Sequence, residues 1–145
     1  MKERPCMKYF MDYVKASYEV ILMGESRTGI NLDHEIEAYV VHTYARYMEK
    51  PNIPTDAIAI QYMSSLNSTT ETKKKLLEKV AEECLLINGL KLNKRRWPSE
   101  TYFLDMGQLA LETRAFTIRP PELFYEAIAR QLPRISIVLD SVKNI

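Results

Sequence analysis

The residues with the strongest chemical character form a basic and aromatic cluster in the second half of the chain. Its members are Lys91, Lys94, Arg95, Arg96 and Trp97. Paired guanidinium groups bind phosphate in a bidentate manner, and an indole ring stacks on a nucleic-acid base. Residues 71–96 contain eight Lys and Arg against four Asp and Glu, whereas the net charge of the whole chain is only +1. An anion or nucleic-acid site is therefore one interpretation of this loop.

The alternative, which we favour, treats the same cluster as a solvated turn. In that case Trp97 packs on the core and the arginines pair with acidic residues elsewhere. Asp105, on the next predicted helix, is placed to meet Arg95 or Arg96. Taken together, the candidate ligand-binding residues are Lys94, Arg95, Arg96, Trp97, Tyr102 and Asp105. A nucleic acid is the less favoured partner for them.

One grouping of histidines and acids raises the question of a metal ion, and it consists of His34, Glu35, Glu37 and His42. Eight residues separate the two histidines, which is about 12 Å along a helix and too far for one ion. The paired ExxH motifs of a di-metal bundle do not occur. Because no nucleophile lies beside a base either, we predict no metal, no cofactor and no catalytic residue.

The composition fits one ordinary globular domain spanning residues 1–145. Apolar residues make up 46% and charged residues 27%, and only 4 glycines are present, which suits helices better than a β-sandwich. Cys6 and Cys84 lack CxxC spacing, so we expect reduced thiols, with Cys84 buried. No apolar run approaches the roughly 20 residues that span a bilayer, and no signal peptide is evident. We therefore expect a cytoplasmic protein without membrane contact.

Apolar residues recur at steps of three and four along most of the chain, which predicts helices joined by short turns. In order, these helices cover residues 7–23, 34–48, 55–66, 68–87, a stretch opened by Pro98 and Ser99, and 123–142. Gly24 is predicted to end the first helix, and Asn88 with Gly89 to end the fourth. Pro133 removes a backbone hydrogen bond from the last, so we expect a kink or break there.

The predicted helix starts rest on capping residues. Asn31 or Asp33 is expected to cap the second helix and Thr55 the third. Ser68 and Glu71 have the spacing of a capping box.

The fifth helix contains Gly107 in its interior, where glycine costs about 1 kcal/mol relative to alanine. With Ala110 three residues later, this predicts a close helix crossing. The inward residues predicted for this helix are Tyr102, Phe103, Met106, Leu109 and Ala110.

Residues 85–110 combine an apolar helix end, a glycine turn, Arg95 and Arg96, and then Tyr102 and an Asp-Met-Gly run. This region resembles a family of small, uncharacterised bacterial all-helical proteins, which tend to carry Phe and Pro where this chain has residues 90–93. The resemblance implies a helical fold and a bacterial origin. It implies no activity.

Together these observations predict an all-α, single-domain, irregular bundle of five or six helices. Because convergent polar groups are not evident, we expect a non-enzymatic interaction or regulatory protein rather than an enzyme. Its partner would be another protein or a second copy of itself, with a helical face that exposes Tyr9, Met11 and Tyr13 as one candidate dimer seam. Core packing of these three residues is the alternative. The basic loop around Arg95 provides the second functional hypothesis.

Overall fold

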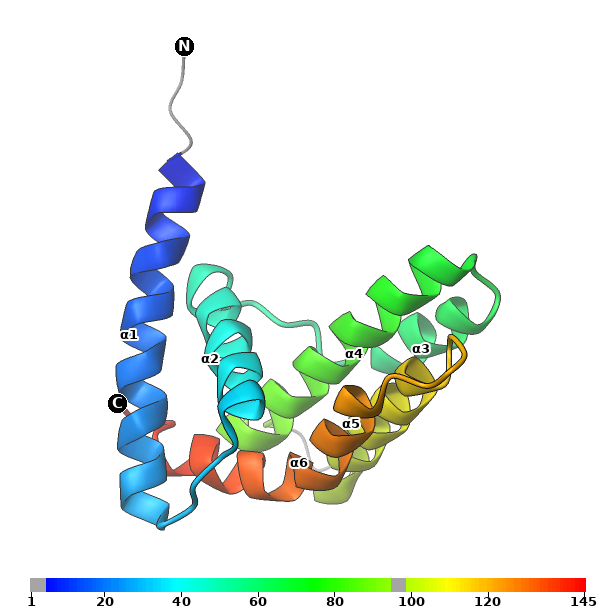
Figure 1. The fold of residues 1–145 in the computed structure, drawn as a ribbon. Coiled ribbons are helices and arrows are strands. Elements are labelled where there is room, and N and C mark those ends of the chain that lie inside the picture. Colours follow the sequence, from blue (N-terminus) through cyan, green and yellow to red (C-terminus); the bar gives the residue numbers. More distant parts are fainter. Residues whose placement is uncertain (1–4, 95–98) are drawn as a thin grey trace.

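The computed structural model describes residues 5–94 and 99–145. Within these residues the chain forms six α-helices and no strand, which confirms the predicted all-α class (Figure 1). The helices are α1 (Pro5–Thr28), α2 (His34–Glu49), α3 (Ile58–Leu66), α4 (Thr70–Leu90), α5 (Glu100–Ala115) and α6 (Leu123–Ser141). They pack against one another as a single irregular bundle.

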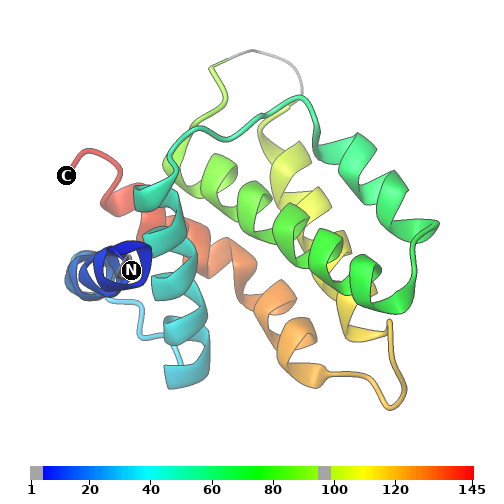
Figure 2. The ribbon, with the colours of Figure 1, turned by 90° about the horizontal axis from the view of Figure 1, so that it is seen from above.

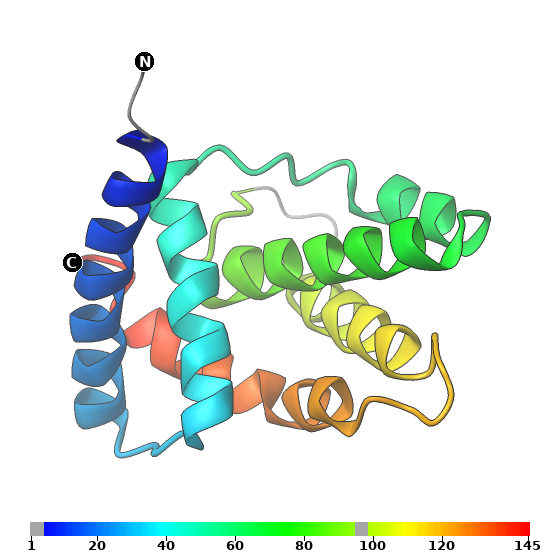
Figure 3. The same ribbon diagram turned by 45° about the horizontal axis from the view of Figure 1, so that its top comes forward.

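Helices α1 and α2 stand side by side as an antiparallel pair, and α4 slants away from them with α3 and α5 packed along it (Figures 1 and 3). Helix α6 connects the two groups, since it contacts α4 and α5 and then crosses to α1. The view from above shows α6 running between the groups (Figure 2). The bundle therefore has its first and last helices in contact.

The core is formed by the apolar stripes that the sequence periodicity indicates. In α4 and α6 the fully buried side chains include Leu77, Val80, Cys84, Ile87, Ile128, Leu132, Ile135 and Leu139. The predicted burial of Cys84 is confirmed, and desolvation raises the pKa of its thiol well above the ordinary value. One predicted inward residue is wrong, because Leu109 is 41% exposed.

The two glycines that were expected to end helices lie inside them instead. Helix α1 continues through Gly24 to Thr28, and Gly29 at φ 74° ends it. A methyl group on Gly24 would lie 2.8 Å from Val138 Cγ1 and 2.9 Å from the Val138 carbonyl oxygen. A methyl group on Gly89 would likewise lie 2.8 Å from Leu139 Cβ. Both glycines therefore allow α6 to approach, and neither is a stop signal.

The predicted close crossing at Gly107 is confirmed. A methyl group there would lie 3.0 Å from Leu132 Cδ2 and 3.1 Å from Cys84 Cβ, so α5 meets both α6 and α4 at this point. Helix α6 runs without a break from Leu123 to Ser141. Pro133 lies within it, and the Ala129 carbonyl oxygen, which the missing N–H leaves free, accepts a hydrogen bond from Gln108 Nε2 at 3.0 Å.

Several predicted helix ends are shifted by a few residues. The capping box is wrong: Thr69 is the N-cap of α4, Ser68 Oγ donates to the Ser64 carbonyl, and Glu71 pairs with Lys74. At the other end, α4 closes at Lys91, whose φ of 56° is left-handed. Asp33 occupies the N-cap of α2 as expected. Helix α3 starts after Ala57 rather than at Thr55.

Candidate functional site

The predicted ligand loop is only partly within the described residues. Arg95, Arg96 and Trp97 lie outside them, so their proposed contact with Asp105 does too. Lys94 is exposed. Asp105 is exposed one turn after Tyr102, whose half-buried ring packs edge-on against Phe103 with centroids 5.0 Å apart. Burial, and secondarily the Cys84 charge, raise the pKa of Tyr102, as expected for a ring that faces the core.

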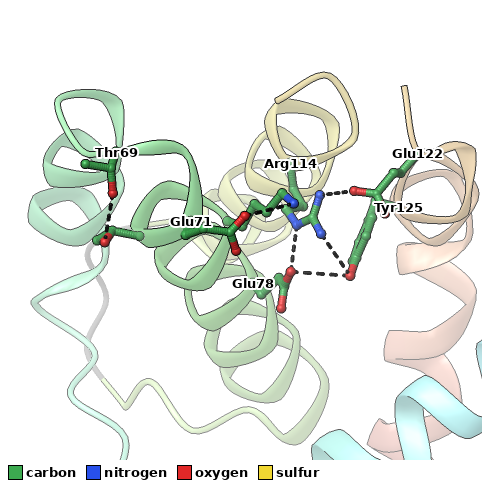
Figure 4. Close-up of polar contacts among 8 residues, drawn as sticks. Thr69, Glu71, Glu78, Arg114, Glu122 and Tyr125 are labelled. Atoms are coloured by element: carbon green, nitrogen blue, oxygen red, sulfur yellow. Dashed lines mark hydrogen bonds and ion pairs between the residues drawn. The ribbon is translucent and has the colours of Figure 1, made fainter. Parts of the chain in front are cut away.

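A buried ion-pair cluster that we did not predict joins α4, α5 and α6. Arg114 is 5% exposed, and its Nε donates to Glu78 Oε2 at 2.6 Å while Nη1 donates to Glu122 Oε1. The Tyr125 ring lies beneath the guanidinium, 4.2 Å from its centroid to Cζ, and its hydroxyl donates to Glu78 at 3.3 Å. Figure 4 shows Arg114 held between Glu78 on one side and Glu122 with Tyr125 on the other.

The groups of this Arg114 cluster are suited to holding helices together rather than to catalysis. Burial lowers the pKa of the guanidinium, but the hydrogen bonds that it donates to Glu78 and Glu122 outweigh this effect and raise the pKa overall. Burial, followed by the Glu78 charge, raises the pKa of Tyr125 as well. Neither group gains or loses a proton near neutral pH, so the cluster can hold three helices together but cannot shuttle a proton.

A cleft of about 370 Å³ opens between α2, the connector that follows it, and α4. Its polar lining includes Thr43, Arg46, Lys50, Asn52, Lys79, Glu82 and Glu83. Arg46 binds Glu82 with two hydrogen bonds, from Nε at 2.9 Å and from Nη2 at 2.7 Å. In this α2–α4 cleft, polar groups from two helices converge on a cavity.

Burial has the largest effect on the pKa values of the two carboxyl groups in the α2–α4 cleft. It raises the pKa of Glu82, against the opposing hydrogen bond from Arg46, and it raises the pKa of Glu83, against the Lys79 charge. Thr43 is 1% exposed and its hydroxyl has no hydrogen-bond partner in the described residues. Buried hydroxyls are nearly always bonded, so Thr43 Oγ1 is exceptional.

A carboxyl pair links the end of α1 to the start of α2. Glu25 is 8% exposed, and its Oε2 accepts a hydrogen bond from the Leu32 N–H at 2.9 Å. A hydrogen bond to Glu25, then burial, raise the pKa of Glu37 to about 7, while the His34 charge lowers it. Two carboxyl groups in contact share a proton because both cannot be ionised at once without repulsion. Glu37 can therefore titrate near neutral pH.

The grouping of histidines and acids that we considered and rejected as a metal site extends over the first helical turns of α2. His34 and His42 are both exposed, and His42 Nδ1 lies 2.8 Å from the Ala38 carbonyl oxygen. Among the described residues, no three His, Cys, Asp or Glu side chains are grouped so that they could hold an ion. No helix in the same residues has the length and apolar character needed to cross a bilayer.

Two helical faces expose large apolar side chains. On α3 these are Ile60 at 69%, Met63 at 60% and Leu66 at 44% exposed. On α1 they are Met11 at 53%, Tyr18 at 47% and Leu22 at 41% exposed. The α1 face differs from the predicted dimer seam, because Tyr13 is half-buried and the Tyr9 side chain lies outside the described set.

Comparison with known proteins gives no relative: neither a protein-family model, nor a curated protein, nor a solved structure matches this chain. The resemblance of residues 85–110 to a bacterial helical family therefore remains a prediction.

The sequence did contain a signal for two of the missed residues. Arg114 follows Gly107 and Leu111 at steps of four and three, so it is a charged residue on the buried stripe of α5. Thr43 follows Val40 by three residues on the buried stripe of α2. A polar side chain at a core position must either find a partner or stay unsatisfied, and these two residues show both outcomes.

Proposed function

We propose that this chain is a non-enzymatic interaction protein that binds an amphipathic helix of a partner protein across the outer face of α3. The observation that carries this proposal is the exposure of Ile60, Met63 and Leu66, which recur at steps of three along one nine-residue helix. Scattered apolar residues on a surface need no explanation, but a contiguous apolar helix face is a common feature of protein interfaces. Methionine in such a face adapts to a partner's shape.

The charges around α3 define the partner's chemistry. Helix α3 has no charged residue, and it packs against α4, where Gln61 Nε2 donates to Glu83 at 3.4 Å. Lys79 and Lys75 are exposed one and two turns before Glu83, and so lie along the edge of α3. A partner helix with an apolar stripe and an acidic flank complements this surface. Two copies of this chain meeting through α3 would instead bring their lysines together.

The test uses two synthetic helical peptides that share a leucine stripe and differ only in flanking glutamates or lysines. The glutamate-flanked peptide should bind more tightly in fluorescence anisotropy, and Ile60→Ser with Met63→Ser should weaken it about tenfold or more. Ile137→Ser is the matched control, because Ile137 is an exposed apolar residue on α6. Equal binding of the two peptides, or equal loss in the control, would contradict the proposal.

Self-association through α1 is a second candidate, supported by the pattern of its outer face. Met11, Tyr18 and Leu22 follow one another at steps of seven and four, and the exposed Lys15 and Glu19 lie among them. If two copies pair antiparallel about the middle of α1, Lys15 of each lies opposite Glu19 of the other. The two charged positions of this face are therefore self-complementary.

Charge reversal tests the self-association in sedimentation equilibrium. Lys15→Glu should weaken a dimer, and adding Glu19→Lys should restore it, since the reversed pair has the same complementarity. A monomer at every concentration would rule out the α1 contact without affecting the proposal for α3.

A further inference from the structure

We propose that the α2–α4 cleft binds a small amphipathic organic anion, with the anionic headgroup at Thr43, Lys50 and Lys79 and the apolar body against Tyr47, Ile53 and Leu86. All six residues line the cleft. Its volume of about 370 Å³ lies within the range of small-molecule sites. This proposal shares Lys79 with the partner surface on α3, but it needs no partner helix.

The first argument is the unsatisfied hydroxyl of Thr43. The side chain is almost fully buried, lines the cleft, and has no hydrogen-bond partner in the described residues. Leaving a buried donor unbonded is unfavourable, so such a group is retained where another molecule can supply the bond. An anionic oxygen in the cleft would accept the Thr43 hydroxyl hydrogen.

The second argument is the balance of charge. Arg46, Lys50 and Lys79 oppose Glu82 and Glu83, which leaves one positive charge in excess. Arg46 is already bound to Glu82 through both nitrogens that face it. Within residues 5–94 and 99–145, neither lysine forms an ion pair. Two ammonium groups are thus available for a headgroup with one or two negative charges.

The third argument is the mixed character of the lining. Tyr47, Ile53 and Leu86 place an aromatic ring and two aliphatic side chains beside the charged groups. Leu86 is 4% exposed and anchors the base of this surface in the core. A purely ionic ligand would leave these side chains without a contact, whereas a ligand with a short hydrocarbon body covers them.

The experiment titrates hexanoate, hexyl phosphate and the neutral isostere hexanamide against the protein and follows backbone amides by NMR. We expect at least one of the two anions to shift the amides of Thr43, Ile53 and Glu83. Hexanamide should bind about tenfold more weakly or worse. The tighter of the two anions identifies a carboxylate or a phosphate headgroup. Equal binding of hexanamide, or no shift of cleft amides with either anion, would overturn the proposal.

Two variants separate binding from folding. Thr43→Val removes the hydroxyl at nearly constant shape, so it should weaken the anion about fivefold to tenfold while the melting temperature rises or stays unchanged. Lys50→Gln with Lys79→Gln should weaken the anion more than tenfold. The control, Arg119→Gln with Arg134→Gln, removes the same charge at two exposed positions that do not line the cleft. Unchanged binding in Thr43→Val, or the same loss in the control, would also overturn the proposal.

Discussion

Glu78 and Glu82 lie one turn apart on α4 and bind arginines from two different helices. Glu78 accepts from Arg114 of α5 at 2.6 Å, and Glu82 accepts from Arg46 of α2 at 2.7 Å. The pKa of the Tyr39 hydroxyl depends on both carboxylates. Burial raises this pKa most, and the charges of Glu82 and Glu78 raise it further. Two successive turns of α4 thus fasten two different helices: Glu78 holds α5, and Glu82 holds α2 of the other group.

The two ion pairs differ in burial, and this predicts different contributions to stability. The Arg114 side chain is 6% exposed and that of Arg46 is 46% exposed. Arg114→Met strands Glu78 and Glu122 and should lower the free energy of unfolding in urea by about 3 kcal/mol. Arg46→Met should lower it by less than about 1 kcal/mol. Adding Glu78→Gln to Arg114→Met should recover part of the loss. Equal effects of the two single variants would contradict this assignment.

Glu37 should make the protein less stable as the pH rises. Its pKa of about 7 in the folded state exceeds the value of about 4.3 for an unfolded glutamate. The folded state therefore holds the proton more tightly, and this contribution is present below about pH 4 and lost as the pH rises through 7. Glu37→Gln stays neutral and should flatten the fall in stability between about pH 5 and pH 8 in urea unfolding. The exposed Glu35→Gln is the control, and an unaltered pH dependence in Glu37→Gln would refute the shared proton.

Gly24→Ala should destabilise the protein even though alanine favours helices. The added methyl group would meet the Val138 carbonyl oxygen, which belongs to the backbone and cannot rotate away. Overpacking of this kind costs about 1 to 3 kcal/mol, more than the roughly 1 kcal/mol gained in helix propensity. Ser26→Ala, at an exposed position two residues further along α1, should be neutral or slightly stabilising. A higher melting temperature for Gly24→Ala would show that α6 does not approach so closely.

The basic loop makes a separate prediction about anions. If Arg95 and Arg96 contact phosphate, replacing both with alanine should weaken binding to heparin and to single-stranded DNA and reduce its salt dependence. Arg130 and Arg134 are exposed on α6, so their double replacement is the matched control. Similar retention of all three proteins on heparin at low salt would leave the solvated turn as the better description of the loop.

Local patterns in the sequence were enough to predict the helices but not all of their ends. Apolar spacing located the buried side of α4 because Leu77, Val80 and Cys84 lie one turn apart. The prediction that Gly24 and Gly89 end helices is wrong. The residues that pack against these glycines, Val138 and Leu139, are distant in sequence, so no local pattern reveals the contact. A glycine in a helix has the same cost in helix propensity whether it ends the helix or lets another helix approach. Only the tertiary structure distinguishes these two cases.

The polar sites depend on partners that no local pattern connects. Glu78 and Arg114 are separated by 36 residues, and so are Arg46 and Glu82. Each of these four residues, taken alone, is typical of a solvated helix face. The sequence pattern therefore indicated a site at the consecutive basic residues instead. A charged or hydroxyl side chain at a core position is the sequence signal that does carry over, as Arg114 and Thr43 show.

The contact between α1 and α6 sets an order of events during translation. Gly24 packs on Val138, and Arg27 Nη1 donates to the Ser141 carbonyl at 2.7 Å, across 114 residues. The amino-terminal helix leaves the ribosome first, yet this part of its surface is covered only once the final helix has emerged. A nascent chain stalled before α6 would present that surface to chaperones and proteases until synthesis resumes.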